Sequence, residues 1–396
     1  MLSLDKVFDA QNVLKSIVRE TKVVRAYGIA PDCELFLKPE NLQITGSFKV
    51  RGSAYKIAML SEEEKKRGVI ACSAGNHAQG VALAATKNGI RSLICLPDTA
   101  PISKVEATKG FGAEVCLVEG CYDDAYQKAL ELKDREGYTF VHPFDDENVI
   151  AGQGTIALEI LNELDNFDAI VVPIGGGGLI SGIAYTAKQI RPSVKVYGVQ
   201  VAGAPSMYNS VREGGIQCLK SVSTIADGIA VKQPGENTYA LVKEYVDDIV
   251  LVSDDEVASA ILALIEKQKM IAEGAGATAV AAVMSGKLDL KNKRVVAVVS
   301  GGNIDVTSLS RVIDRGLLNS GRSSSLLIEL IDKPGQLKEI SRIIADCGGN
   351  VTGVHYEKGN TESVNGCYLR IEMETRNFDH VHLITQTLRD EGFKIV

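Results

Sequence analysis

Short apolar runs alternate with longer amphipathic segments through about residue 310, and this alternation constrains the fold more than any other feature. Runs that are rich in β-branched residues and nearly free of charge are typical of parallel strands buried on both faces. The longer segments suit the helices that connect such strands, so we expect an α/β fold. The predicted strands are Val69–Cys72, Ser92–Leu96, Glu114–Val118, Ala169–Pro173, Lys195–Gln200 and Arg294–Val299. The predicted helices are Gln79–Lys87, Tyr122–Glu136, Gly154–Leu164, Leu179–Ile190 and Asp254–Lys269.

The predicted strands form one group before about residue 145 and another after it, so more than one parallel sheet is expected. We predict a main region over residues 1–316, with a smaller subdomain at about 50–145 and a larger subdomain built from the flanking segments. Residues 317–325 (LLNSGRSSS) are small and polar, which predicts a linker.

The pattern changes after this linker. Residues 326–396 follow the order strand, helix, two strands, helix and strand, which is the βαββαβ arrangement of ferredoxin-like domains. The first helix is expected to have one apolar face, formed by Leu337, Ile340, Ile343, Ile344 and Cys347. The third strand is expected to turn alternate residues inward, namely Cys367, Leu369, Ile371 and Met373. We therefore predict a second, compact domain.

Charge and apolar content exclude several classes of protein. The chain of 396 residues has 43 basic and 50 acidic residues, and this net charge of −7 argues against nucleic acid as a partner. The longest uncharged stretch, residues 169–187, contains Pro173 and four consecutive glycines, so no membrane span is expected. Asp5, Lys6 and Asp9 interrupt the apolar run that a signal peptide needs. Eight scattered cysteines without a CxxC pair indicate reduced thiols and the cytoplasm.

The first motif with chemical potential is Thr45–Gly52 (TGSFKVRG), which places Lys49 among small and aromatic neighbours. A lysine that forms a Schiff base with an aldehyde needs a desolvated amine of lowered pKa. For an isolated lysine, a surface position in a turn is the competing interpretation.

The second motif, Ser73–Gly80 (SAGNHAQG), follows a predicted strand and opens a predicted helix. Hydroxyl, amide and main-chain N–H groups at the start of a helix can bind a carboxylate or a phosphate. An ordinary helix cap would fit the same residues, and His77 considered by itself favours a structural role.

The third motif, Gly175–Leu179, lies between a predicted strand and a helix, where consecutive glycines let the backbone wrap closely around a phosphate. A dinucleotide site is the competing interpretation, but Ile180 and Ser181 stand where its third glycine or alanine is needed. No acidic residue occurs from Leu179 through Arg212, and the P-loop ending is missing too. The loop therefore suits a single phosphate.

The fourth motif, Ser300–Asn303 (SGGN), lies at the carboxyl end of a predicted strand, where ligands bind in parallel-sheet proteins. Considered alone, it would also fit a tight turn. An amine for an aldehyde, an anion site, a phosphate loop and a polar strand end together predict a pyridoxal 5'-phosphate site. Five histidines without zinc-ligand spacing predict no metal site.

These four motifs, in this order, resemble the fold-type II pyridoxal-phosphate enzymes of the serine/threonine dehydratase family, which have two subdomains with parallel sheets. The similarity is strongest to threonine ammonia-lyases that have a C-terminal ACT domain. The resemblance implies that Lys49 binds the cofactor aldehyde and acts as the catalytic base. The other cofactor-binding residues that it implies are Phe48, Asn76, Gly175, Gly176, Gly177, Gly178, Leu179 and Ser300. The substrate-binding residues that it implies are Ser73, Gly75, Asn76 and His77.

The activity implied is conversion of L-threonine to 2-oxobutanoate and ammonia, with L-serine as a slower substrate. A neutral Ser300 at the ring nitrogen would make the cofactor a weaker electron sink than a carboxylate would, which favours loss of the β-hydroxyl. Serine racemases resemble the chain but have a serine acid/base at the position of Ala74, and their divalent-cation ligands match Gln200 and Ser206 here. The sequence also leaves open a β-replacement synthase and a non-catalytic amino-acid sensor.

Residues 326–396 resemble an ACT domain, in which Asp332-x-Pro334-Gly335-x-Leu337 matches the first strand–helix turn. Such domains pair across subunits and bind amino acids at the shared interface. The resemblance therefore implies a homo-oligomer, dimer or tetramer, with an amino acid or a nucleotide as effector. A packing module without a ligand would have the same pattern, since a fold alone does not establish a function.

Overall fold

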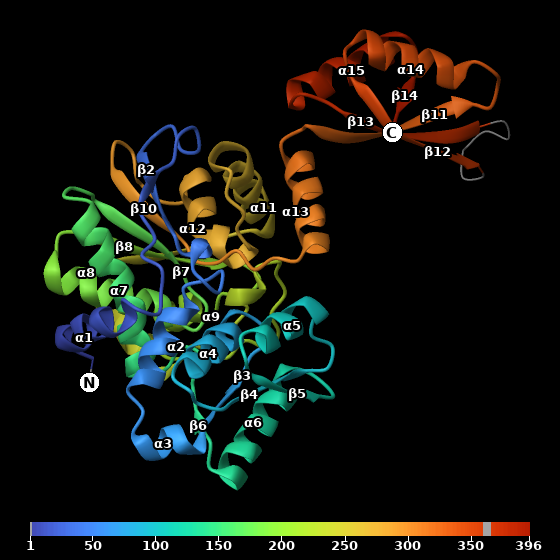
Figure 1. The fold of residues 1–396 in the computed structure, drawn as a ribbon. Helices are drawn as coiled ribbons and strands as arrows, with labels where there is room; N and C mark the ends of the chain where they lie inside the picture. The colour runs from blue at the N-terminus through green and yellow to red at the C-terminus, as the bar shows by residue number, and fades with distance from the viewer. Residues whose placement is uncertain (1, 359–365) are drawn as a thin grey trace. The chain divides into compact units, whose positions relative to one another are not determined.

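The computed structural model describes residues 2–358 and 366–396. Its internal contacts divide the chain into two compact units, Met1–Leu309 and Ser310–Val396 (Figure 1). The α/β fold class expected from the sequence is confirmed, because the first unit has two sheets with mostly parallel strands. In the part of the chain that the structure describes, no helix is both long enough and apolar enough to cross a membrane.

The larger sheet of the first unit has the strand order β1-β2-β10-β7-β8-β9. Its strands are β1 (Val24–Arg25), β2 (Glu34–Pro39), β7 (Ala169–Pro173), β8 (Lys195–Val201), β9 (Asp248–Val252) and β10 (Arg294–Val299). All pairings are parallel except that of β1 with β2, and in Figure 1 the N-terminal β2 lies beside the late strand β10. Segments from both ends of the unit therefore build this sheet.

The smaller sheet has the order β5-β4-β3-β6, with parallel pairing throughout. Its strands are β3 (Val69–Cys72), β4 (Ser92–Pro97), β5 (Glu114–Val118) and β6 (Thr139–Phe140). The six predicted strands are confirmed to within one residue at each end. The sequence prediction missed β2, because Glu34 and Lys38 interrupt its apolar pattern, although Lys38 is fully buried in the structure.

Helices cover both sheets, and the five helices expected from the sequence are among them. The helices of the first unit are α1 (Leu4–Leu14), α2 (Lys49–Ala58), α3 (Glu62–Arg67), α4 (Asn76–Lys87), α5 (Ile102–Gly110), α6 (Tyr122–Glu136), α7 (Glu147–Glu163), α8 (Gly178–Ile190), α9 (Ser206–Glu213), α10 (Glu236–Tyr245), α11 (Asp254–Ala263) and α12 (Gly274–Met284). Short helical turns form at η1 (Glu40–Leu42), η2 (Asp227–Ile229) and η3 (Leu264–Gln268), and α13 (Val306–Asn319) runs into the second unit.

Helix α7 begins seven residues before the predicted start at Gly154, because the side chain of Asp146 caps it by accepting the N–H groups of Asn148 and Val149. The glycines within α7 do not mark the start of the helix, but allow close packing against its neighbours. A Cβ atom added at Gly152 would lie 2.7 Å from the carbonyl oxygen of Arg51. This glycine lets α7 approach the first turn of α2 closely.

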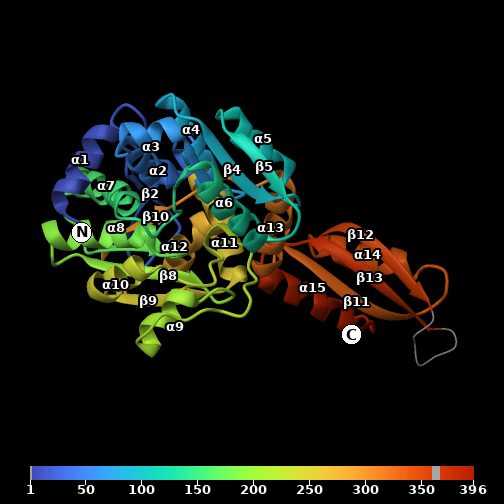
Figure 2. The same cartoon turned by 90° about the horizontal axis from the view of Figure 1, so that it is seen from below.

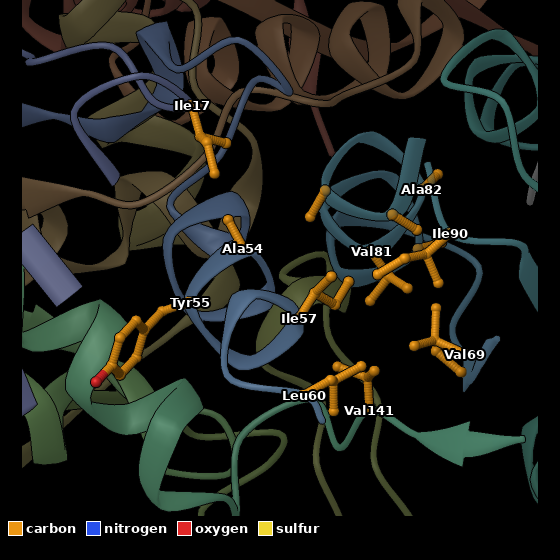
Figure 3. Close-up of a cluster of buried hydrophobic side chains, with 14 of the residues drawn as sticks. Ile17, Ala54, Tyr55, Ile57, Leu60, Val69, Val81, Ala82, Ile90 and Val141 are labelled. Carbon is orange, nitrogen blue, oxygen red and sulfur yellow. The ribbon is translucent and has the colours of Figure 1, made fainter. Parts of the chain in front are cut away.

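The core around α2 fixes the position of that helix. Figure 3 shows Ile57 of α2 beside Val81 of α4, in a cluster that also includes Ala54 of α2, Val69 of β3 and Val141. All five side chains are essentially inaccessible to solvent. Burial of so much apolar surface stabilises the packing of α2 on α4, and thereby fixes the helix that begins at Lys49.

A buried network of charges adds a second anchor for α2. The Arg51 guanidinium donates to both Glu40 oxygens at 2.8 Å and to both Glu159 oxygens at 2.6 and 2.8 Å. Lys38 donates to Glu159 at 2.6 Å and to the carbonyl oxygen of Thr21. Paired charges of this kind hold their elements in one arrangement, because a member that lost its partners would stay buried and unpaired.

The second unit has the predicted βαββαβ order. Its helices, and its strands other than the last, can be followed in Figure 2. Its elements are β11 (Ser323–Ile331), α14 (Gln336–Asp346), β12 (Asn350–Lys358), β13 (Gly366–Glu374), α15 (Phe378–Asp390) and β14 (Lys394–Ile395). The sheet is antiparallel with the order β12-β13-β11-β14, and the four predicted inward residues of β13 are fully buried. Residues 359–365, which belong to the predicted domain, lie outside the described residues.

Two details of the second unit differ from expectation. Residues 317–325 are not an irregular linker, because α13 extends to Asn319 and β11 begins at Ser323. The small serines there join the sheet because β13 supplies a paired strand, as in the pairing of Ser323 with Glu374. Leu337 is 43% exposed rather than part of the buried face, since it lies in the first turn of α14 at the end of the apolar stripe.

We predict that Arg51→Met lowers the free energy of unfolding by about 3–5 kcal/mol, because Glu40 and Glu159 would stay buried without their cation. Urea denaturation of the full chain measures this change. The control is Arg135→Met on α6, where the ion pairs are exposed and little change is expected. Equal effects of the two substitutions would contradict a structural role for the buried network.

Candidate active site

The first and fourth motifs meet where β10 ends and α2 begins. Ser47 forms an isolated bridge with Gly301, and the N–H of Phe48 donates to the carbonyl oxygen of Ser300 at 3.1 Å. The N–H of Gly302 donates to Gly46 at 2.9 Å. These main-chain contacts place the start of α2 at the carboxyl end of a central strand, the end at which parallel sheets bind ligands.

Lys49 is the first residue of α2, and its side chain is half-buried. Its Nζ atom donates to the carbonyl oxygen of Pro143 at 2.7 Å and lies 5.4 Å from the ring centroid of Phe48. Desolvation lowers the pKa of Lys49 to about 8, although the carboxylate of Glu273 opposes this shift. An amine with this pKa is partly uncharged near neutral pH, as a nucleophile or base must be.

The second motif forms the N-terminus of α4, directly after β3. Asn76 begins this helix, and the Oγ of Ser73 accepts the N–H of Gly75 at 3.1 Å. The first N–H groups of a helix have no partner within it, so this end is suited to an anion. A Cβ atom at Gly80 of the same helix would lie 3.2 Å from the carbonyl group of Lys49, so the first two motifs are in contact.

The His77 side chain is occupied in the core of the protein. Its Nε2 donates to the carbonyl oxygen of Val141 at 2.8 Å, which leaves Nδ1 to accept from Ser53 Oγ at 3.4 Å. Desolvation, helped by the charge of Lys49, lowers the pKa of His77 to about 3. The imidazole is therefore neutral, and only the main-chain N–H of His77 remains for the substrate role predicted from the sequence.

The third motif turns from β7 into α8 with a backbone that only glycine tolerates. Gly177 precedes the helix with φ of 99°, and its neighbours pack against Phe144. A Cβ atom at Gly176 would lie 2.5 Å from the Phe144 ring, and one at Gly178 would lie 2.9 Å from its Cα atom. Since Phe144 follows the Pro143 that contacts Lys49, the loop lies beside the lysine. Its bare N–H groups fit a phosphate.

Ser300 is buried at the carboxyl end of β10, with only a long hydrogen bond of 3.4 Å to the carbonyl oxygen of Ala275. A neutral hydroxyl is thus the polar group that this strand end offers to a ligand.

The structure brings all four predicted motifs together, and their donors fit a phosphorylated aldehyde cofactor with an aromatic nitrogen.

Two site residues were missed by sequence reasoning. Glu273 is buried and accepts a hydrogen bond from the Asn76 side chain at 2.6 Å. It is the only charged residue between Met270 and Met284, a signal that could have revealed it. Asn303 belongs to the fourth motif, but no role was predicted for it, and its side chain donates to Asn76 Oδ1 at 2.7 Å.

Of the two positions that match the cation ligands of related racemases, Gln200 is engaged within the protein, whereas the buried Ser206 hydroxyl has no hydrogen-bond partner among the described residues. The Gln200 oxygen accepts the N–H of Tyr208 at 2.8 Å, and its amide nitrogen lies 3.4 Å from the carbonyl oxygen of Ile174. Across residues 2–358 and 366–396 there is no group of three or more histidine, cysteine or acidic side chains placed to hold a metal ion.

Comparison with known proteins agrees with this geometry. Residues 14–301 match the family described as pyridoxal-phosphate dependent enzyme. An L-threonine ammonia-lyase of Thermotoga maritima is 48% identical over 100% of this chain and 99% of its own. The processed form of threonine deaminase isoform 2 from Solanum lycopersicum has a TM-score of 0.75 at 38% identity, covering 79% of this chain and 94% of that chain. A maize serine racemase has a TM-score of 0.75 at 34% identity, covering 80% and 98%.

We predict that acylation of Lys49 in the cofactor-free protein rises with pH and levels off above about 8, because desolvation lowers the pKa of its amine. Mass mapping of peptides after brief treatment with an amine reagent at a series of pH values measures this. The exposed Lys66 serves as an internal control in the same samples. Identical profiles for the two lysines would contradict the desolvated site.

Proposed function

The chain belongs to the family of pyridoxal-phosphate dependent enzymes, and we propose that it converts L-threonine to 2-oxobutanoate and ammonia. L-Serine, which lacks one methyl group, is proposed as a slower substrate that gives pyruvate and ammonia. The observation that carries this proposal is the desolvated Lys49 amine, which lies beside the loop that suits a phosphate. The chain is also similar over its whole length to an L-threonine ammonia-lyase.

We propose the following binding roles. Lys49 holds the cofactor aldehyde covalently, Phe48 packs beside it, and residues 175–179 bind the phosphate through main-chain N–H groups. Asn76 donates to the 3-oxygen of the cofactor, and Ser300 meets the ring nitrogen. The substrate carboxylate binds Ser73 and the N–H groups at the start of α4, where the helix dipole favours a negative charge.

Bound pyridoxal 5'-phosphate supplies an electron sink for negative charge at the substrate Cα atom. Once the substrate amine has displaced Lys49 from the cofactor aldehyde, the free amine of Lys49 would remove the Cα proton, which its pKa of about 8 allows near neutral pH. The β-hydroxyl leaves as water, and water added later releases ammonia and leaves 2-oxobutanoate. Ser300 carries no charge to strengthen the sink, which favours loss of the β-hydroxyl over long-lived negative charge at Cα.

Racemisation is a second candidate, favoured by the similarity to the maize serine racemase. It needs an acid/base on the face of the substrate opposite Lys49. The related racemases are expected to use a serine that Ala74 replaces here, so we propose elimination as the main reaction.

We propose that residues 326–396 form an ACT domain that binds an amino-acid or nucleotide effector, and that the chain works as a homo-oligomer in the cytoplasm. The antiparallel βαββαβ unit with a complete core of its own supports the first part of this proposal. An effector changes activity only if it binds two states of the enzyme with different affinity.

We predict that Lys49→Ala lowers the rate of 2-oxobutanoate formation at least ~10³-fold, because the base and the covalent anchor are lost together. An assay of 2-oxo acid release from L-threonine measures this, with Lys66→Ala on the exposed face of α3 as control. Most activity remaining in the Lys49 variant would refute the assignment. Chiral analysis of the residual threonine and serine tests racemisation in the same samples.

We predict that at least one of isoleucine, valine and adenosine monophosphate shifts half-saturation by L-threonine, by about 5–150-fold if the coupling is typical. Saturation curves with and without each compound measure the shift. Linkage requires threonine analogues to change effector binding by the same factor. Unchanged curves with all three would contradict regulation by these compounds.

A further inference from the structure

Two side chains outside the predicted set of ligands contact the amide of Asn76, and a third lies next to them. Asn303 Nδ2 donates to Asn76 Oδ1 and to the carbonyl oxygen of Thr45, both at 2.7 Å. Glu273 Oε1 accepts from Asn76 Nδ2 at 2.6 Å. Gln79 lies at the edge of this cluster, with its Oε1 3.4 Å from Asn303 Nδ2.

These contacts leave only one orientation for the Asn76 amide. The carbonyl oxygen of Thr45 can only accept, so the amide nitrogen of Asn303 must face it. The same nitrogen donates to Asn76, whose oxygen therefore faces Asn303 and whose nitrogen faces Glu273. One N–H of Asn76 bonds Glu273, and the other has no partner among the described residues, so it can bond a ligand.

Glycines of two motifs make room for the two residues that orient Asn76. A Cβ atom at Gly301 would lie 2.3 Å from Glu273 Oε1, and one at Gly46 would lie 2.2 Å from Asn303 Oδ1. Such separations are far below contact distance, so a larger residue at either position would displace the orienting side chain. The glycines of TGSFK and SGGN thus serve the same cluster.

Glu273 does not serve its own helix. It is the N-cap residue of α12, yet its side chain makes no capping bond there. Among the described residues it forms no ion pair, although it is only 5% exposed. Burial and the charge of Asp227 raise the pKa of Glu273 to about 7. The hydrogen bond from Asn76, the charge of Lys104 and the N–H of Asn303 oppose this rise. A carboxylate kept buried at this cost has a specific partner, which is Asn76.

We propose that Glu273 is a positioning residue, which together with Asn303 holds the Asn76 amide so that its second N–H points at the cofactor's 3-oxygen. This inference rests on the proposed role of Asn76. Without Glu273 the amide can rotate and present its oxygen to another acceptor, which is repulsive. Since Glu273 reaches the cofactor's 3-oxygen through Asn76, loss of Glu273 should weaken that contact only while Asn76 is present.

The test measures the dissociation constant of pyridoxal 5'-phosphate from the cofactor-free full chain, by absorbance titration above pH 8, where Glu273 is ionised. The variants are Glu273→Met, which keeps the size and removes the acceptor, Asn76→Ala, and the two combined. Glu273→Gln retains an acceptor oxygen, and Glu213→Gln removes an exposed charge as the matched control. Thermal unfolding of each cofactor-free variant is measured in parallel.

We expect Glu273→Met to weaken cofactor binding about tenfold, the typical effect of losing one charge-assisted hydrogen bond. The double variant should bind pyridoxal 5'-phosphate no more weakly than Asn76→Ala does. Once Asn76 is lost, Glu273 has no amide left to orient. Glu273→Gln should restore most of the affinity, and Glu213→Gln should bind like the wild type.

A dissociation constant of the double variant that rises by the product of the two single effects would overturn the inference, because Glu273 would then act independently of Asn76. Wild-type affinity in Glu273→Met would overturn it as well, while leaving the proposed function intact. A wild-type chain that binds no pyridoxal 5'-phosphate at all would instead overturn the proposed function, and the inference with it.

Discussion

The structure depends on one constraint, which is that the Lys49 amine must be kept away from water and yet remain within reach of a ligand. An exposed lysine is charged at neutral pH and cannot act as a nucleophile. Here desolvation lowers the pKa of Lys49 to about 8, and the carbonyl oxygen of Pro143 fixes the position of the amine. Both effects need the first turn of α2 to stay where it is.

Three features hold that turn, and each uses a different kind of interaction. Apolar packing of α2 on α4 buries Ala54 and Ile57, and the charges around Arg51 connect α2 to α7 and η1. Main-chain bonds to Ser300 and Gly302 connect the start of α2 to the end of β10. Because the network of Arg51 begins two residues after Lys49, stability and function are connected over a very short distance in the chain.

Much of this could be predicted from the sequence. Buried parallel strands are strongly apolar, so β3, β5, β7 and β10 were found at their observed ends, and the three motifs that follow β3, β7 and β10 were found with them. Strand β2 was missed because Lys38 is buried through pairing with Glu159, which no local pattern reveals. The use of the His77 side chain and the contact of Glu273 with Asn76 depend on partners far away in the chain, so spacing could not show them.

The central claim is that the ε-amine of Lys49 binds the cofactor covalently, and reductive trapping tests it most directly. The full chain is incubated with pyridoxal 5'-phosphate, treated with borohydride and digested, and the peptides are identified by mass. Our account predicts the reduced cofactor on the peptide that contains Lys49, with little on other lysines. Labelling at another lysine in preference to Lys49, or no labelled peptide at all, would contradict it.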